Sequence, residues 1–223
     1  YTRQLAAALA QAAPHDTLIT MQHLRQPAPL VAAPNARRMA LITPPHHRYE
    51  ALTLPVELLR ARASVIHFPD LIMPPRCPAP AVITIHDLAF LHFPEILDDA
   101  ARRYYGQIER SARQAAAVIA VSESTLHDIV ERIGLPIERI DVVYEAAAPC
   151  FWPQRVEPGS ECTIGENTLM ARDFLLFVST IEPRKNLPML LQALRICRDR
   201  HPERGYQLVV AGARGWREAP IYQ

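Results

Sequence analysis

The sequence has no strong excess of charge of either sign and no long hydrophobic run. Its 223 residues include 24 Lys and Arg against 23 Asp and Glu, for a net charge of +1. A nearly neutral chain has no global attraction to a polyanion, so nucleic acid is not favoured as a partner. No apolar run approaches the ~18 residues that a membrane-spanning helix needs. The length is sufficient for one large domain or two small ones.

Cysteine and glycine are also scarce. The four cysteines form no C-x-x-C pair and are scattered along the chain, at Cys77, Cys150, Cys162 and Cys197. This pattern favours incidental thiols in a reducing cytoplasm. The 7 glycines, against 21 prolines, form no P-loop, no G-x-G-x-x-G and no G-x-S-x-G. NTPase, dinucleotide-binding and hydrolase functions therefore lose their usual sequence support.

Short apolar runs alternate with helical patterns along most of the chain. Strands are predicted at 16–20, 38–44, 63–68, 81–85, 116–121, 139–144, 174–178 and 206–211. Helices are predicted at 1–12, 54–62, 98–115, 187–199, and from Ser122 or Ser124 to Gly134. Continuous apolar strands that alternate with helices indicate an α/β fold with parallel sheets.

A proline-containing segment with little periodicity divides this pattern into two units. Residues 151–165 have the composition of a linker. We therefore predict a first domain at 1–150 and the start of a second domain at 166–223. The second domain has few elements, so we expect it to be only partly present.

Ligands of open α/β sheets bind beyond the carboxyl ends of the strands. This rule selects His86 and Asp87 after strand 81–85, and Ser122 after strand 116–121. A lone histidine more often has a structural role, but Asp87 adds a second polar group at the same place. Ser122 is first of all a candidate helix cap, and this role is compatible with contact to a ligand.

The loop after strand 174–178 contains Arg184 and Lys185, immediately before a predicted helix. A helix N-terminus has free N–H groups and partial positive charge, and so favours anions. Arg offers a planar fork to phosphate oxygens, and Lys offers a point charge. A solvated loop with two surface charges is the alternative, and the position between strand and helix favours phosphate. Gly212, after strand 206–211, marks a weaker candidate.

Four segments resemble the family-4 retaining glycosyltransferases in order and spacing. They are "ITIHDLAFLHFPE", "AVIAVSESTLHDIVERIGLPIERIDVVYEAAAPCFWP", "FLLFVSTIEPRKNLPMLLQAL" and "LVVAGARGW". The resemblance covers most of residues 1–15 and 52–223. It implies the GT-B fold, in which two Rossmann-like parallel-sheet domains face each other across a cleft.

The resemblance also implies roles for the selected residues. Arg184 and Lys185 would neutralise a leaving diphosphate, while His86 and Asp87 would face the donor sugar. The remaining donor-binding candidates are Ser122, Ser179, Thr180, Glu182, Asn186 and Gly212. The implied reaction moves a hexose, with mannose a guess from the family alone, from a nucleotide-diphosphate sugar to a polysaccharide or lipid-linked acceptor. It retains the anomeric configuration, with the nucleotide sugar as co-substrate and with no metal or other cofactor.

The chain departs from the family pattern at several places. Ser179 stands where glycine is usual, and Ala146 and Ala147 lie where a glycine is expected. The family's first strand with its glycine-rich loop, and its later Glu-containing motif, fall outside these residues. We therefore expect a protein of these residues alone to be poorly active.

Two other functions, and the role of one basic surface, were left undecided by the sequence. A GT-B nucleotide-sugar epimerase and a non-catalytic nucleotide-sugar binder are the competing functions. On helix 98–115, four arginines cluster on the arc opposite the apolar face: Arg102, Arg103, Arg110 and Arg113. A solvated surface is the simpler interpretation of this arc, and a landing patch for anionic lipid is the functional one. The expected location is the cytoplasm, with peripheral contact to the inner face of the cell membrane as an extension.

Overall fold

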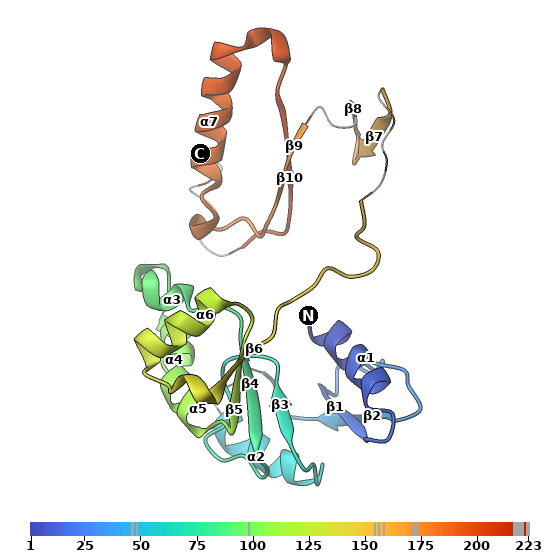
Figure 1. Cartoon of the computed structure of the whole chain (residues 1–223), viewed down its shortest axis with the longest axis vertical. Helices are drawn as coiled ribbons and strands as arrows, with labels where there is room; N and C mark the ends of the chain where they lie inside the picture. The colour runs from blue at the N-terminus through green and yellow to red at the C-terminus, as the bar shows by residue number, and fades with distance from the viewer. Residues whose placement is uncertain are drawn as a thin grey trace. The chain divides into compact units, whose positions relative to one another are not determined.

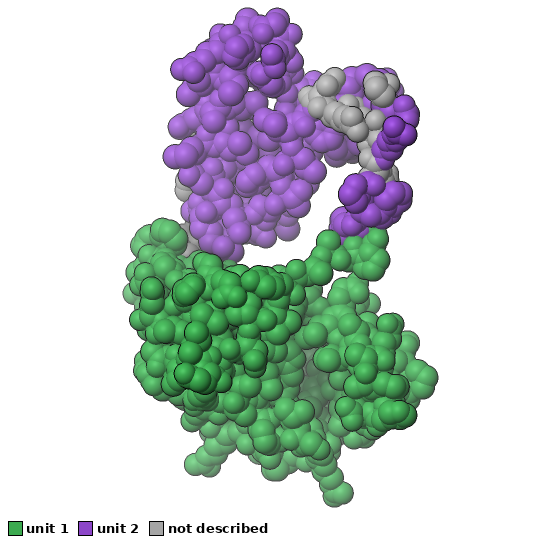
Figure 2. Space-filling model, in the orientation of Figure 1, with its two compact units in different colours: residues 1–150 green, residues 151–223 purple. Residues whose placement is uncertain are grey.

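The computed structural model describes residues 1–45, 47, 49–97, 99–153, 155, 157, 159–170, 174–215 and 221. The chain divides into two compact units, unit 1 (Tyr1–Cys150) and unit 2 (Phe151–Gln223) (Figure 2). Both units are built on parallel strands, so the predicted α/β class is confirmed.

Unit 1 contains two parallel sheets (Figure 1). The larger is four-stranded, in the order β3 (Ile66–Phe68), β4 (Ala81–Ile85), β5 (Ala117–Ala120) and β6 (Ile140–Val142). The smaller pairs β1 (Leu18–His23) with β2 (Ala36–Leu41). Because β4, β5 and β6 are consecutive neighbours and all parallel, their carboxyl ends lie at one edge of the sheet.

The helices of unit 1 include several short ones. They are α1 (Thr2–Ala12), α2 (Glu50–Leu59), α3 (Ala89–His92), α4 (Asp99–Tyr105), α5 (Ile108–Gln114) and α6 (Glu123–Asp128). Single turns are formed by η1 (Pro94–Ile96), η2 (Ile129–Ile133, a π-helix continuing α6) and η3 (Ile137–Arg139). The predicted Ser122 cap is confirmed, because its hydroxyl accepts a hydrogen bond from the Thr125 N–H at 3.1 Å. Gly134 ends η2 with a left-handed φ of 68°.

The predicted single helix over 98–115 is wrong. The chain forms α4 and α5 with a break at Gly106 and Gln107. The Gly106 N–H donates to the Arg102 carbonyl at 2.9 Å, and a Cβ on Gly106 would lie 2.9 Å from that same oxygen. The tight turn therefore needs glycine, and glycine is also a poor residue for a helix interior.

The core of unit 1 forms where the sheet meets α5, α6 and η2. Residues that are 0% exposed include Ile83, Ile85, Ala112, Val118, Ala120 and Ile129. A smaller cluster joins Leu54 and Leu58 of α2 to Ile66 of β3. Because β4 and β5 sit inside the larger cluster, the residues that follow them are held on a rigid base.

Unit 2 has a smaller core. It pairs β9 (Phe174–Val178) with β10 (Gln207–Ala211) in parallel, joined through η4 (Pro183–Lys185), α7 (Leu187–Arg200) and η5 (Pro202–Arg204). Its buried side chains, among the described residues, are Ile181, Glu182, Leu187 and Leu194.

Unit 2 also contains a hairpin that the sequence analysis missed. Strand β7 (Glu161–Ile164) lies inside the predicted 151–165 linker, and it pairs antiparallel with β8 (Asn167–Met170), which follows that segment. The two residues between the strands, Gly165 and Glu166, form the turn, and Gly165 has a φ of 62°. A two-residue turn with glycine between short strands was the available signal.

Replacing Ile83 by Ala should lower the free energy of unfolding by about 2–5 kcal/mol, because a fully buried side chain leaves a cavity. Ile137, which is 53% exposed, provides the matched control, and Ile137→Ala should change stability by less than ~0.5 kcal/mol. Urea unfolding followed by circular dichroism measures both. Equal losses in the two variants would contradict the position of Ile83 in the core.

Candidate functional site

His86 follows β4 directly and is held from several sides. Its Nδ1 lies 3.1 Å from Oε1 of Glu145, and its Nε2 lies 3.3 Å from the Pro69 carbonyl oxygen. The ring of Tyr1 packs against it edge-on, with the ring centroids 4.6 Å apart. The Thr125 hydroxyl donates to the His86 carbonyl at 3.3 Å. These contacts tie the end of β4 to the segments that follow β3, β5 and β6.

Asp87 and Ser122 lie beside His86 at the same edge of the sheet. Oδ1 of Asp87 accepts a hydrogen bond from the Ala89 N–H at 3.0 Å, which helps to start α3. Ser122 caps α6, and its neighbour Thr125 contacts the His86 carbonyl. The structure therefore brings together the three residues that the strand-end rule selected in the first domain.

Glu145 was missed by the sequence analysis. It lies just beyond β6, the strand next to β5, and its carboxylate faces His86. The same strand-end rule would have selected it if it had been applied to strand 139–144.

A half-buried histidine, His67, lies on β3, the strand next to β4. Nε2 of His67 is 2.8 Å from the hydroxyl oxygen of Thr84, which is 0% exposed, and the Tyr1 hydroxyl is 3.4 Å from that oxygen. Burial lowers the pKa of His67 from its ordinary value of 6.5. A neutral, hydrogen-bonded ring in this position supports β3 and β4 from inside.

In unit 2, the predicted cations lie in the turn between β9 and α7. Arg184 and Lys185 belong to η4, and Asn186 follows with a left-handed φ of 53° at the start of α7. Nε of Arg184 lies 2.5 Å from Oε1 of Glu182, whose carboxylate is buried. The contact is an ion pair rather than a well-directed hydrogen bond.

Because of this ion pair, Glu182, Arg184 and Lys185 have different roles in the turn. Glu182 is committed to Arg184, and it orients the guanidinium while the Arg184 side chain remains 34% exposed. Lys185 has no side-chain partner among the described residues. The Asn186 side-chain amide lies 3.5 Å from the Met189 sulfur. The turn thus presents two cations immediately before the N-cap of a 14-residue helix.

Ser179 and Gly212 lie side by side at the carboxyl ends of β9 and β10. The Ser179 N–H donates to the Ala211 carbonyl at 3.0 Å, and its hydroxyl donates to the Thr180 carbonyl at 3.1 Å. A Cβ on Gly212 would lie 1.8 Å from the Ser179 carbonyl oxygen. Gly212 is therefore required for backbone approach, and Thr180 is exposed next to this contact.

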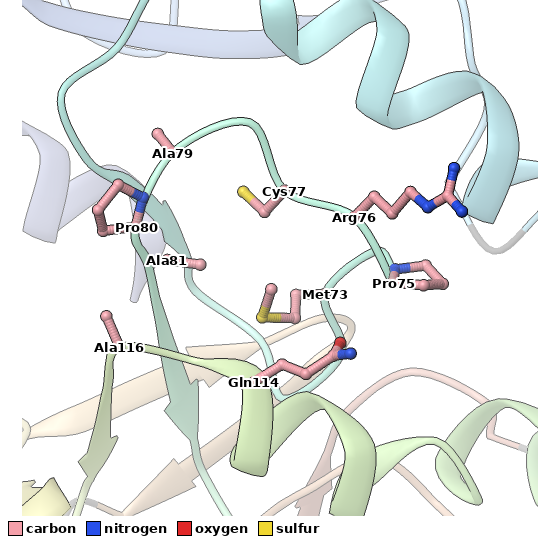
Figure 3. Close-up of a pocket in the computed structure, with 9 residues that line it drawn as sticks. All are labelled: Met73, Pro75, Arg76, Cys77, Ala79, Pro80, Ala81, Gln114 and Ala116. Atoms are coloured by element: carbon pink, nitrogen blue, oxygen red, sulfur yellow. The ribbon is translucent and has the colours of Figure 1, made fainter.

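Among the described residues of unit 1, two of the hollows lie beside the larger sheet. One, of about 380 Å³, lies near Met73, Cys77, Ala81 and Ala116, and in Figure 3 the Arg76 side chain extends away from the other labelled residues. Ala81 begins β4 and Ala116 precedes β5, so this hollow is at the edge of the sheet opposite His86.

The other hollow, of about 350 Å³, includes Phe68, Glu50, Arg103 and Tyr104 and lies near the end of β3. Burial raises the pKa of the Tyr104 phenol, and the nearby Asp70 carboxylate raises it further. The phenol therefore stays protonated, and its hydroxyl donates to Oδ2 of Asp70 at 3.2 Å.

The four arginines of the predicted basic face lie on two helices, and two of them have partners within the fold. Arg110 donates to the Met73 carbonyl and to Gln107, and Arg113 donates to the Ile133 carbonyl and pairs with Glu109. The break at Gly106 places these two on α5, whereas Arg102 and Arg103 belong to α4. Only Arg102 and Arg103 of the four have no side-chain partner among the described residues.

In the described part of the chain, no group of three or more His, Cys, Asp or Glu side chains is arranged to hold a metal ion. The helices described there are all too short or too polar to cross a membrane.

The sequence model of Glycosyltransferase Family 4 matches residues 1–147, about two thirds of the chain. The chain belongs to glycosyltransferase family 4. The matched region of this family-4 chain contains His86, Asp87, Ser122 and Glu145. The α/β fold with parallel sheets agrees with the Rossmann-like domains of the GT-B glycosyltransferases, so the resemblance seen in the sequence is confirmed.

The chain is also similar to the O-antigen chain mannosyltransferase B of Escherichia coli. The two are 28% identical over 162 residues, which cover 71% of this chain and 41% of that relative. The family-4 chain thus spans less than half the length of the relative that it matches.

The free energy of unfolding should fall as the pH decreases below about 6.5, because the unfolded chain protonates His67 at its ordinary pKa of 6.5, whereas partial burial lowers the pKa of His67 in the folded protein. Above that value both states are neutral at His67, and its contribution disappears. Urea unfolding at a series of pH values should show a shallower acid decline in His67→Gln than in the wild type. Identical declines would rule out this contribution.

Replacing Gly212 by Ala should destabilise the pairing of β9 with β10 by about 1–3 kcal/mol, because the new methyl group overlaps the Ser179 carbonyl. Amide hydrogen exchange in these two strands provides the measurement. Gly205→Asn is the control, since Gly205 has open space around it and a φ of 55° that asparagine tolerates. Unchanged exchange in Gly212→Ala would mean that the close approach is absent in solution.

Proposed function

We propose that the complete protein is a retaining hexosyltransferase. In this proposal it moves a sugar, with mannose as the first candidate, from a nucleotide-diphosphate donor to a polysaccharide or lipid-linked acceptor. The bond between the sugar C1 and the diphosphate oxygen breaks, and the nucleoside diphosphate leaves with the electron pair. The acceptor hydroxyl forms the new bond to C1 and loses its proton.

The observation that carries the proposal is the Arg184–Lys185 turn at the start of α7 in a family-4 chain. Negative charge grows on the diphosphate as the C1–O bond breaks, and cations fixed in advance stabilise that charge more than they stabilise the bound donor. Glu182 orients one of the two cations, and the helix N-terminus adds its own partial positive charge. Since these groups supply the neutralising charge, the proposal includes no metal.

The carboxyl edge of unit 1 supports the same reaction from its own residues. His86 is held in a fixed orientation there, with Asp87 exposed next to it. We assign these two residues to the donor sugar. The Escherichia coli relative is named an O-antigen chain mannosyltransferase, and that name supports mannose and a polysaccharide acceptor.

The first test is a transfer assay with the full-length protein. GDP-mannose and other nucleotide sugars would be supplied with lipid-linked or oligosaccharide acceptors, and the products identified by mass spectrometry and NMR. A glycosylated acceptor with the donor's anomeric configuration supports the proposal. A changed free nucleotide sugar would instead indicate an epimerase, and binding of donor without turnover would indicate a non-catalytic binder.

Lys185→Ala should lower kcat by about 10²–10³-fold, by analogy with the loss of a single donor to a developing oxyanion. Lys185 is preferred to Arg184 for this test, because removing Arg184 would leave the buried Glu182 carboxylate without its partner and could unfold the turn. Arg184→Lys keeps the charge but loses the planar fork, and it should also lower kcat.

Arg195→Gln is the matched control, since Arg195 is an exposed cation on the same helix and has no side-chain partner among the described residues. Its kcat should equal that of the wild type. If Lys185→Ala and Arg195→Gln behave alike, the turn does not neutralise the leaving group.

A further inference from the structure

The outward side of α2 is an exposed apolar stripe. Leu52, Val56 and Leu59 are 73%, 64% and 61% exposed, and they stand at positions i, i+4 and i+7 of the helix. Residues with this spacing share one side of a helix. All ten residues of α2 are described, and none with a polar side chain falls on this side. A continuous apolar side that faces water indicates a surface for binding.

The other sides of α2 fix this orientation. Leu54 and Leu58 are buried in the cluster that joins α2 to β3. The Glu57 carboxylate holds the end of β2, where it accepts hydrogen bonds from the Ile42 N–H at 2.7 Å and from the Thr43 N–H at 2.8 Å. Turning the stripe inward would expose the two leucines and break both hydrogen bonds, so the fold keeps three large aliphatic side chains in water.

Basic side chains border the stripe. Arg60 and Arg62 come directly after α2 and are both exposed. The sequence contains no acidic residue between Glu57 and Asp70 that would neutralise them. Aliphatic side chains with cations at their border match a bilayer surface, because the aliphatic groups enter the boundary of the acyl chains and the cations meet anionic headgroups.

A second copy of the chain matches this side of α2 less well. A two-fold interface brings the same surface against itself. Arg60 and Arg62 would then approach their own copies, and like charges across an interface oppose association. An anionic surface has the opposite effect, since it attracts both arginines.

We propose that α2 docks on a membrane that contains anionic lipid. The docking surface consists of the stripe, Leu52, Val56 and Leu59, together with Arg60 and Arg62. It differs from the arginine surface predicted from sequence, whose residues lie on α4 and α5. The inference goes beyond the proposed transfer reaction and does not depend on it, but docking would bring the enzyme to a lipid-linked acceptor.

The first test is co-sedimentation of the full-length protein with vesicles. Equal parts of phosphatidylcholine and phosphatidylglycerol should bind the wild type, and phosphatidylcholine alone should bind it more weakly. The triple variant Leu52→Gln/Val56→Gln/Leu59→Gln should bind the mixed vesicles roughly 100-fold more weakly, because three apolar side chains no longer leave water. The double variant Arg60→Gln/Arg62→Gln should bind them roughly 30-fold more weakly and with less dependence on salt.

The double variant Met189→Gln/Ile196→Gln on α7 is the matched control. These side chains are 62% and 51% exposed. Polar residues share their side of the helix, with Gln192 three positions after Met189 and Asp199 three positions after Ile196. Binding of this variant should equal that of the wild type. Urea unfolding checks that all variants are folded, as expected for exposed positions.

A tryptophan in the stripe tests insertion directly. In the presence of lipids with brominated acyl chains, Val56→Trp should show more fluorescence quenching than the wild type, and Met189→Trp should not. Absence of added quenching in Val56→Trp would overturn the insertion of the stripe.

Three further outcomes would overturn the proposal. One is that the wild type does not bind the mixed vesicles, or that the α2 triple variant and the α7 control bind alike. Another is loss of binding in Arg102→Gln/Arg103→Gln but not in the α2 triple variant, which would place the contact on α4. The third is a change of oligomeric state in the α2 triple variant, measured by light scattering, which would mean that the stripe meets a second copy.

Transfer to a water-soluble acceptor separates this inference from the proposed function. The α2 triple variant should retain wild-type transfer to that acceptor while it loses vesicle binding. A wild-type protein that binds vesicles through α2 but transfers no sugar would leave the docking surface in place and contradict only the proposed function.

Discussion

Parallel hydrogen bonding joins β4 to β5 and β5 to β6, and this pairing determines which residues meet at the carboxyl edge of the larger sheet of unit 1. In a parallel sheet every strand ends at the same edge, so the residues after three strands meet there even though they are far apart in sequence. His86, Ser122 and Glu145 come together for this reason. The buried apolar strands beneath them keep the backbone of these residues fixed.

Each unit uses a carboxylate to hold a side chain that faces a ligand in our proposals. In unit 2, buried Glu182 orients Arg184. In unit 1, Glu145 contacts His86. The two cases differ in energy, because a buried carboxylate that loses its partner is strongly destabilised, whereas an exposed pair contributes at most about 1 kcal/mol. The Glu182–Arg184 pair is therefore part of the fold of unit 2, while the Glu145–His86 pair can be changed with little effect on stability.

The predictions from sequence were correct where a single local pattern was sufficient. The apolar run at 81–85, the cap at Ser122 and the stop at Gly134 depend on neighbours within a few residues, and the structure contains all three. The prediction of one helix over 98–115 was wrong because its apolar arc continued through Gly106, whose tight turn starts a second helix. The basic face was predicted on that continuous helix, and its four arginines are instead divided between α4 and α5.

Sequence by itself determined the α/β class, the family and the strand ends where polar residues gather, because these follow from periodicity and from motifs of contiguous residues. Only the tertiary structure decided which side chains contact one another. A hydrogen bond between His86 and Glu145 joins residues 59 positions apart, and no local pattern shows which nitrogen faces a carboxylate and which faces a carbonyl. The sequence also did not predict the ion pair of Glu182 with Arg184 or the close packing of Gly212 against Ser179. Both depend on burial and backbone approach, which exist only once the strands have paired.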